Sequence, residues 1–276
     1  MLSAGDSQRV AELMRETAAA ELLPRFRNLA QGDVREKRPG DVVTVADVAS
    51  EQRLAVGLAK ILPGVPVVGE EAVEADAGLL DLIGRRGETC WVVDPLDGTS
   101  NFSKGHDLFA MIVCLVHDAE TVGGWILDIP NDRMAMAAKG QGATLDGKPV
   151  RFAGKPRLPR GFIGFKVRKE FDRQLPPAQR QLLGNLTSLN CAGREYVEIL
   201  SGHRDFSLYR QTKPWDHAAG ALMVSEAGGL AERFDRTPYS PVGGLRSGII
   251  TAVSTEVMVR VSGALESVKM PLLAGR

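Results

Sequence analysis

The chain has 276 residues, of which 44% are hydrophobic and 25% are charged. This length suits one large domain or two ordinary domains, and the composition excludes a disordered chain, a collagen-like chain and a disulfide scaffold. The 34 Lys and Arg residues balance the 34 Asp and Glu residues, which speaks against a nucleic-acid-binding protein because such proteins usually carry a basic excess.

The balanced total conceals an uneven distribution of charge along the chain. Residues 70–132 carry 13 acids and 3 bases, whereas residues 133–216 carry 16 bases and 7 acids. An acidic stretch followed by a basic stretch raises the question whether cations and anions meet between the two parts.

Cysteine usage and hydropathy bear on compartment and membrane association. The three cysteines are too few for a disulfide framework and have apolar neighbours, so we interpret them as core residues: Cys90, Cys114 and Cys191. Asp6 and Arg9 stand where a signal peptide needs an apolar run, and the longest apolar run, residues 108–116, is too short to span a membrane. We therefore expect a cytoplasmic protein without a membrane partner.

The first half of the chain mixes helices and strands. Apolar residues at helical spacing predict helices over residues 7–30 and 47–62, with a polar loop at 31–40 between them. Short apolar runs at 66–68 and 91–93 are typical of buried strands. Three longer runs joined by short polar turns predict an antiparallel meander, over residues 108–116, 121–127 and 133–138.

One segment imitates a nucleotide-binding loop. Residues 142–148 fit the pattern Gly-x4-Gly-Lys, but Pro149 follows where a Ser or Thr hydroxyl must bind magnesium. The pair Asp146-Gly147 is instead a typical hairpin turn. We therefore reject a nucleotide phosphate loop here.

Beyond about residue 160 helices and strands alternate. The expected helices cover residues 177–184, 193–201, 216–227 and 255–267, and the expected strands cover residues 206–209 and 248–253. The pattern predicts an α+β half over residues 1–150 and an α/β half over residues 151–276.

The segment around residues 90–102 carries the clearest chemistry. A buried strand leads directly into Asp94 and Asp97, and Pro95 is expected to end that strand because it cannot donate a backbone hydrogen bond. Gly98 and Thr99 permit a tight turn and the start of a helix, where free backbone N–H groups can hold an anion. Each pair of carboxylates about 4 Å apart costs about 4 kcal/mol at an effective dielectric constant near 20, so a cation is needed. Taken alone, the segment also fits a turn with a surface Asp.

Two other segments place acids at similar positions. Glu70 follows the predicted strand at 66–68, and Asp216 stands at the predicted start of a helix. Taken alone, the first fits a solvated loop and the second a helix cap. Together the segments offer four hard oxygen ligands, which suit Mg²⁺ or Mn²⁺ rather than Zn²⁺: Glu70, Asp94, Asp97 and Asp216.

These segments resemble the inositol monophosphatase family of metal-dependent, lithium-sensitive phosphatases. The resemblance covers residues 41–254 and includes Asp41-Val-Val-Thr44-x-x-Asp47-x-x-x-Glu51 and Lys139-Gly-x-Gly-Ala143. It implies a layered αβαβα sandwich with an antiparallel sheet in the N-terminal half and an α/β arrangement in the C-terminal half. It also implies a homodimer that acts on a small phosphorylated metabolite.

The resemblance assigns metal ligands residue by residue. Glu70, Asp94 and the backbone carbonyl of Leu96 would hold a first Mg²⁺. Asp94 would bridge to a second ion that Asp97 and Asp216 complete, and a third, weaker ion would lie on the Glu70 side. The expected cofactor is therefore two to three Mg²⁺ ions, which Mn²⁺ can replace.

The resemblance also implies a catalytic arrangement. Glu70 and the Thr99 hydroxyl, oriented by Asp47, would activate the attacking water, and the backbone N–H groups of Gly98 and Thr99 would bind the phosphate. Lys37 falls near a lysine that the family carries on a mobile loop over the site. The implied mechanism is a two-metal, in-line attack of water on a phosphate monoester.

Substrate residues depart from the pattern of inositol-preferring relatives. Residues 193–196 read Gly-Arg-Glu-Tyr where those relatives have Gly-Ser/Thr-Ala-Ala, and Tyr209 replaces an acid that grips substrate hydroxyls. Arg194 either binds a second anionic group of the substrate or pairs with Glu195 or an outer carboxylate. Asp216 would contact the substrate as well as a metal ion.

Three further residues remain open at this stage. Arg210 and Lys213 either face an anionic substrate or balance the acidic half of the chain, and His217 either relays a proton or is satisfied by packing. The expected substrate is an inositol-1-phosphate-like or sugar-alcohol phosphate. The alternatives are histidinol phosphate, a 3′,5′-bisphosphate nucleotide, or a non-catalytic regulatory role that keeps the fold.

Overall fold

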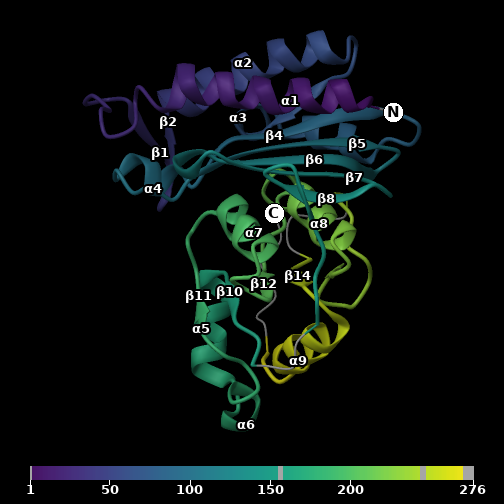
Figure 1. The fold of residues 1–276 in the computed structure, drawn as a ribbon. Coiled ribbons are helices and arrows are strands. Elements are labelled where there is room, and N and C mark those ends of the chain that lie inside the picture. The colour runs from purple at the N-terminus through teal and green to yellow at the C-terminus, as the bar shows by residue number, and fades with distance from the viewer. Residues whose placement is uncertain (1, 155–157, 243–246, 270–276) are drawn as a thin grey trace.

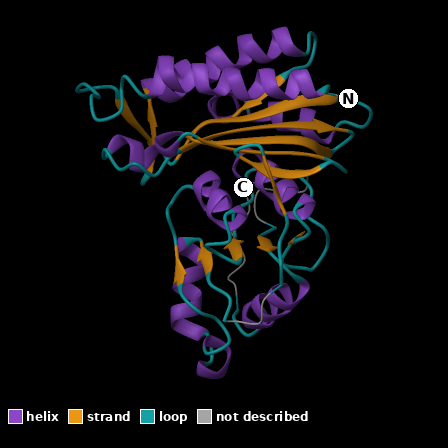
Figure 2. Cartoon of the chain, viewed as in Figure 1, coloured by secondary structure: helices purple, strands orange, loops and turns teal. Residues whose placement is uncertain are grey.

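The computed structural model describes residues 2–154, 158–242 and 247–269, and these form five layers (Figure 1). Two helices cover one face of a seven-stranded sheet, and two others fill the space between that sheet and a five-stranded sheet (Figure 2). The remaining long helices cover the outer face of the smaller sheet. The αβαβα sandwich predicted from the sequence is confirmed.

The outer helical layer comes from the N-terminus. Its elements are α1 (Ala4–Thr17), the π-helical turn η1 (Ala18–Leu22), strands β1 (Val34–Arg38) and β2 (Asp41–Thr44), and α2 (Val45–Ile61). The first helix was expected to reach residue 30, but the α-helix ends at Thr17 and η1 stops before Pro24, which lacks the N–H that a continuing helix needs. The expected loop at 31–40 contains β1, whose mostly exposed, charged residues lack the apolar alternation that would have revealed a strand.

The seven-stranded sheet has the order β3-β4-β5-β6-β7-β8-β9, with only β3 and β4 parallel. Its strands are β3 (Val67–Gly69), β4 (Thr89–Asp97), β5 (Ala110–His117), β6 (Glu120–Asp128), β7 (Arg133–Ala138), β8 (Gly142–Leu145) and β9 (Lys148–Val150). Between β3 and β4 lie α3 (Glu70–Ala75) and the 3-10 segment η2 (Ala77–Gly84); α4 (Thr99–Ser103) follows β4, and η3 (Ile129–Asn131) follows β6. The antiparallel meander and the hairpin turn at Asp146-Gly147 are confirmed.

Strand β4 does not end at Pro95 as expected. Asp94 pairs with Ile112 and Asp97 pairs with Ala110, so β4 has one residue more than β5 at this point. Such a bulge tolerates a proline because the ladder is already interrupted there. The bulge carries both aspartates to the end of the sheet.

The C-terminal half contains a mixed sheet in the order β11-β10-β12-β14-β13. Its elements are β10 (Gly161–Ile163), α5 (Phe165–Gln174), α6 (Pro177–Arg180), β11 (Leu186–Thr187), α7 (Ala192–Leu200), β12 (Phe206–Tyr209), α8 (Pro214–Glu226), β13 (Leu230–Glu232), β14 (Ile249–Ala252) and α9 (Thr255–Glu266). Helix α5 was not predicted, and the helix expected at 177–184 is the single turn α6. The domain division at residue 150 stays a prediction.

Helices α7 and α8 form the layer between the sheets (Figure 1). They approach closely because a Cβ on Gly220 would lie 2.2 Å from Cδ2 of Tyr196, so only glycine fits there. On the other side, Gly124 of β6 lies against Ala219. The small residues of α8 therefore allow it to pack closely against the large sheet, which places Asp216 at the edge where β4 ends.

In the part of the chain that the structure describes, no helix has the length and apolar character needed to cross a membrane.

Candidate active site

Three carboxylates from distant parts of the sequence meet at one edge of the large sheet. Glu70 begins α3 directly after β3, Asp94 lies beside the bulge of β4, and Asp216 lies in the first turn of α8. Asp94 is the last paired residue before the bulge. Each of the three residues offers an oxygen atom, and these oxygens all lie within 4.8 Å of one another. The sequence had grouped these residues, and the fold brings them together.

Burial and mutual repulsion raise the pKa values of two of these carboxylates. Burial, followed by the charges of Glu70, Asp97 and Asp216, raises the pKa of Asp94 well above its usual range. Burial likewise raises the pKa of Asp216 to about 8, although Lys213 opposes the shift. Carboxylate oxygens held this closely with little access to water are the donor set that Mg²⁺ and Mn²⁺ prefer, so the residues present fit a divalent cation.

Lysines partly neutralise the cluster. The Nζ atom of Lys213 lies 2.9 Å from Oε1 of Glu70. Lys37, from the β1–β2 hairpin, lies 2.9 Å from Oε1 of Glu71 and 3.6 Å from Oε1 of Glu70. Burial lowers the pKa of Lys213, but the Asp216 and Glu70 carboxylates outweigh burial and raise it overall. Lys37 therefore does reach the site, whereas the sequence left its position open.

Asp97 lies beside this cluster and is held from α7. Its Oδ2 atom accepts hydrogen bonds from the Gly193 N–H at 2.5 Å and from the Cys191 thiol at 3.2 Å. These contacts bridge more than 90 residues of sequence, and no sequence signal identified them. Cys191 is buried, as expected for a core residue, but it also orients a candidate metal ligand.

Thr99 and Asp47 form the second predicted pair. The Thr99 hydroxyl can donate to Oδ1 of Asp47, at 2.9 Å, or to the carbonyl of Leu96, at 2.8 Å. The other Asp47 oxygen accepts bonds from the N–H and hydroxyl of Thr44, which caps α2. Burial raises the pKa of Asp47 to about 7, although the hydrogen bonds from Thr44 and Thr99 oppose the shift.

Glycine is required at two positions next to the candidate metal ligands, Gly69 before Glu70 and Gly98 after Asp97. A Cβ on Gly69 would lie 2.2 Å from Cδ of Glu51, whose carboxylate accepts the N–H groups of Glu71 and Ala72. Glu51 thereby anchors the first turn of α3, a role that sequence reasoning had not assigned. Gly98 has φ +88°, and a Cβ there would lie 2.7 Å from the carbonyl oxygen of Leu108. The turn into α4 therefore requires glycine.

Two adjoining cavities surround these groups. The first, which we call the carboxylate cavity, has a volume of about 570 Å³ and is lined by Glu70, Asp94, Asp97, Gly98, Thr99, Lys213 and Asp216, among others. The second, the side cavity, has a volume of about 290 Å³ and shares Asp97, Asn190 and Asp216 with the first. Tyr209 and Arg210 line the side cavity.

The structure corrects one predicted substrate residue. Arg194 lines neither cavity; its guanidinium lies 2.7 Å from Oδ2 of Asp128 and 3.0 Å from Oε1 of Glu198. Pairing with an outer carboxylate is therefore the correct alternative, because Asp128 is buried and needs a counter-ion.

His217 is held by two polar neighbours. The Tyr196 hydroxyl lies 3.1 Å from Nδ1 of His217, and the carbonyl oxygen of Gln211 lies 3.1 Å from Nε2. Burial lowers its pKa to about 4, so the imidazole is neutral at neutral pH. These contacts support the packing interpretation of His217.

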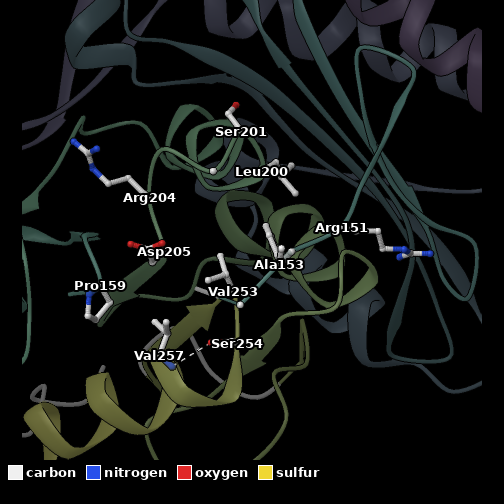
Figure 3. Close-up of a pocket in the computed structure, with 13 residues that line it drawn as sticks. Arg151, Ala153, Pro159, Leu200, Ser201, Arg204, Asp205, Val253, Ser254 and Val257 are labelled. Atoms are coloured by element: carbon white, nitrogen blue, oxygen red, sulfur yellow. Dashed lines mark hydrogen bonds between the residues drawn. The ribbon is translucent and has the colours of Figure 1, made fainter. Parts of the chain in front are cut away.

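A third cavity, of about 220 Å³, is lined by residues at the end of α7, just before β12, just after β14 and at the start of α9, among others (Figure 3). It shares none of its described lining residues with the other two cavities. Its single described acid, Asp205, accepts a hydrogen bond from the Arg160 N–H. The cavity therefore does not assemble a set of carboxylates.

The acidities predict how pH affects the metal-free protein. The pKa of Asp216 is about 8 in the folded chain against the ordinary 3.8, so its stabilising neutral form persists well above pH 4 and is lost as the pH rises through about 8. We expect the melting temperature without metal to fall between about pH 5 and pH 8, and less so with saturating Mg²⁺, which favours the charged form. Thermal melts with and without Mg²⁺ measure this, and a metal-free protein that is most stable at pH 8 would contradict it.

Comparisons with known proteins agree with this geometry. A model described as the inositol monophosphatase family matches residues 7–267. The Nus factor SuhB of Pseudomonas aeruginosa is 32% identical over 79% of this chain and 82% of its own length. The inositol-1-monophosphatase of Mesorhizobium japonicum is 31% identical over 86% of each chain. An IMPase structure from Thermotoga maritima has a TM-score of 0.74 at 22% identity, covering 93% of this chain and 96% of that one, which shows the shared fold.

Proposed function

The chain belongs to the inositol monophosphatase family and is a metal-dependent phosphatase, and from this premise we propose that it hydrolyses a small phosphate monoester with two to three Mg²⁺ ions. The observation that carries the proposal is the meeting of the Glu70, Asp94 and Asp216 oxygens within 4.8 Å. Mn²⁺ can replace Mg²⁺ because the ligands are hard oxygens. We further propose a cytoplasmic homodimer that lithium inhibits.

The proposed ligands divide between two principal ions. Glu70, Asp94 and the carbonyl of Leu96 would hold one, and Asp94, Asp97 and Asp216 would hold the other, with a weaker third ion on the Glu70 side. Bound Mg²⁺ would supply Lewis acidity toward the phosphoryl oxygens and lower the pKa of a water molecule. The raised pKa values of Asp94 and Asp216 support this assignment, because a divalent cation would relieve the repulsion among the carboxylates.

The chain's own residues supply the remaining chemistry. We propose that Glu70 and the Thr99–Asp47 pair position the attacking water and accept its proton. The water oxygen forms a bond to phosphorus as the ester bond opposite it breaks, and the departing alkoxide oxygen takes up a proton from solvent water to give the alcohol. The backbone N–H groups of Gly98 and Thr99 would bind the phosphoryl oxygens during this in-line displacement.

The proposal extends to the identity of the phosphate monoester. The name of the Mesorhizobium japonicum relative supports inositol-1-phosphate, and sugar-alcohol phosphates share its polyol character. Histidinol phosphate and 3′,5′-bisphosphate nucleotides are the alternatives within the same chemistry. The volume of the carboxylate cavity, about 570 Å³, suits a small molecule rather than a macromolecule.

A phosphate-release panel tests the proposed function. We expect Mg²⁺-dependent release from p-nitrophenyl phosphate and from at least one of inositol-1-phosphate, a sugar-alcohol phosphate, histidinol phosphate and adenosine 3′,5′-bisphosphate. A chelator should abolish the release and lithium should reduce it. A folded protein that releases phosphate from none of these compounds at saturating Mg²⁺ would contradict the proposal.

A regulatory role is the second candidate, and the name of the 32% identical Nus factor favours it. Such a role predicts association with a component of the transcription machinery that survives loss of catalysis. A nucleic-acid role should show binding whose affinity falls steeply with salt. Absent phosphate release together with salt-sensitive nucleic-acid binding would favour this candidate over the phosphatase.

A further inference from the structure

The side cavity is placed to receive the alcohol part of a substrate. It is lined by residues of α5, α7, β12 and α8, and it joins the carboxylate cavity at Asp97, Asn190 and Asp216. A phosphate bound at the carboxylates would therefore have its alcohol next to this opening. The inference rests on the proposed function and concerns which alcohol the cavity accepts.

The side cavity has no free carboxylate for a polyol. Among its described lining residues, the acids are the candidate metal ligands Asp97 and Asp216. The nearby carboxylate of Glu195 is engaged within the protein: Oε1 accepts bonds from the Ser188 hydroxyl and the Leu189 N–H, and Oε2 accepts one from the Tyr209 hydroxyl. Glu195 is also buried. The wall therefore offers the hydroxyl donors of a polyol neutral acceptors, such as the side chains of Asn190 and Gln211, and not the charged acceptor that binds hydroxyls more strongly.

Two cationic side chains line the side cavity, where a polyol-binding site would need a free carboxylate. Lys166 and Arg210 both line the side cavity, and neither makes a hydrogen bond or an ion pair with any residue that the structure describes. Lys166 lies in the first turn of α5, which contains no acid. A cation at the positive end of a helix dipole is unfavourable on its own, so its position is not explained by helix stability. Together the two side chains would attract an anion and repel an ammonium group.

An exposed aromatic ring borders the same cavity. Phe165, the first residue of α5, is 76% exposed and lines the side cavity beside Lys166. A large apolar side chain left in water gains free energy when a flat apolar surface covers it. Neither an inositol ring, which is rich in hydroxyls, nor a simple sugar alcohol offers such a surface.

We propose that the alcohol part of the substrate carries a second anionic group, held by Lys166 and Arg210, and a planar ring that covers Phe165. A nucleoside bisphosphate is the simplest class of phosphate monoester with both features. The cleaved phosphate would lie at the carboxylates and the second phosphate at the two cations. Histidinol phosphate is disfavoured because its ammonium group would face the same cations.

Steady-state kinetics on a matched set of substrates tests this proposal. Adenosine 3′,5′-bisphosphate carries both the planar ring and a second phosphate, and adenosine 3′-monophosphate carries the planar ring alone. Fructose 1,6-bisphosphate carries a second phosphate without a planar ring, and inositol-1-phosphate carries neither feature. Histidinol phosphate carries an ammonium group. We expect the highest kcat/KM for the nucleoside bisphosphate, with a loss of about tenfold or more when the second phosphate is absent.

Substitutions test whether Lys166, Arg210 and Phe165 cause the expected substrate preference. Lys166→Gln combined with Arg210→Gln should raise KM for adenosine 3′,5′-bisphosphate by about tenfold or more and change its kcat little. The substitution Phe165→Ser should raise KM for both adenosine substrates. Lys169→Gln, an exposed lysine of α5 outside the cavity lining, is the matched control. Melting temperatures verify that each variant folds.

The outcomes separate this inference from the proposed function. Turnover that favours inositol-1-phosphate or histidinol phosphate, or a double variant with unchanged KM for the bisphosphate, would overturn the inference while the phosphatase assignment stands. Equal turnover of fructose 1,6-bisphosphate and the nucleoside bisphosphate would overturn the ring contact. Failure to hydrolyse any compound, p-nitrophenyl phosphate included, would remove the proposed function and with it the inference.

Discussion

The substitution Asp94→Asn is expected to abolish Mg²⁺-dependent phosphate release, with a loss of at least about a thousandfold. Asp94 is 1% exposed and lies in the group of oxygens within 4.8 Å. In the proposed arrangement it is the carboxylate that both principal ions share. An amide of the same shape keeps the packing but removes the charge, so both ions should bind more weakly.

The same variant should not be destabilised without metal. Burial and the charges of Glu70, Asp97 and Asp216 oppose the ionised form of Asp94, so removing its charge relieves repulsion. We expect its metal-free melting temperature to equal or exceed that of the wild type. The increase in melting temperature that Mg²⁺ is expected to produce in the wild type should be lost, since a ligand stabilises the folded state only when it binds that state. Calorimetry and fluorescence melts measure both quantities.

A control variant separates the effect of removing this particular carboxylate from the effect of removing any negative charge. Asp172→Asn removes a carboxylate that is 71% exposed on α5, where its pairing with Arg168 contributes little to stability. Its activity and its response to Mg²⁺ should match the wild type. An Asp94→Asn protein that retains turnover would refute the metal assignment, whereas one that melts far below the wild type without Mg²⁺ would refute the account of repulsion.

The sequence grouped the candidate metal ligands because their positions follow from local rules. A strand that runs into an acid and then into a turn predicts a carboxylate at the end of a sheet, which holds for Glu70, whereas Asp94 lies near that end because of the bulge in β4. Pro214 as the first helical residue, with an acid two residues later, predicts the placement of Asp216 in the first turn of a helix. That the three acids belong to one site was implied by the family resemblance.

Long-range pairings could not be predicted in this way. The sequence suggested Glu195 only as a possible partner of Arg194, but in the structure its carboxylate accepts a hydrogen bond from Tyr209, which comes from a different element. Arg194 could face inward or outward until the fold placed the buried Asp128 within reach. The charged, exposed strand β1 lacks the alternation that reveals a buried strand, and α5 has only two buried apolar residues, Val167 and Phe171, to indicate a helix. Lys166 and Phe165 went unnoticed for the same reason.

The substitution Thr99→Ala should reduce kcat by about 10²- to 10⁴-fold, the usual contribution of a positioned proton acceptor. The Thr99 hydroxyl has one proton and two acceptors, Asp47 and the carbonyl of Leu96, within 2.9 Å. When the hydroxyl donates to Asp47, its lone pairs can accept a proton from water while its own proton passes to the Asp47 carboxylate. Thr99→Ser keeps the hydroxyl and should restore most of the rate, while the Mg²⁺ dependence of melting should stay near that of the wild type in both variants.

The pH dependence distinguishes this role from a structural one. Asp47 accepts a proton through Thr99 only as a carboxylate, and burial raises its pKa to about 7. At saturating Mg²⁺ the wild-type kcat should therefore rise with pH up to about 7 and then level off. Asp47→Asn should lower kcat and remove this limb, because no group remains there to ionise. Mg²⁺ titrations at each pH separate this effect from weaker metal binding in acid. An Asp47→Asn profile parallel to the wild type, or a Thr99→Ala protein with more than half the wild-type rate, would show that the pair only supports the turn.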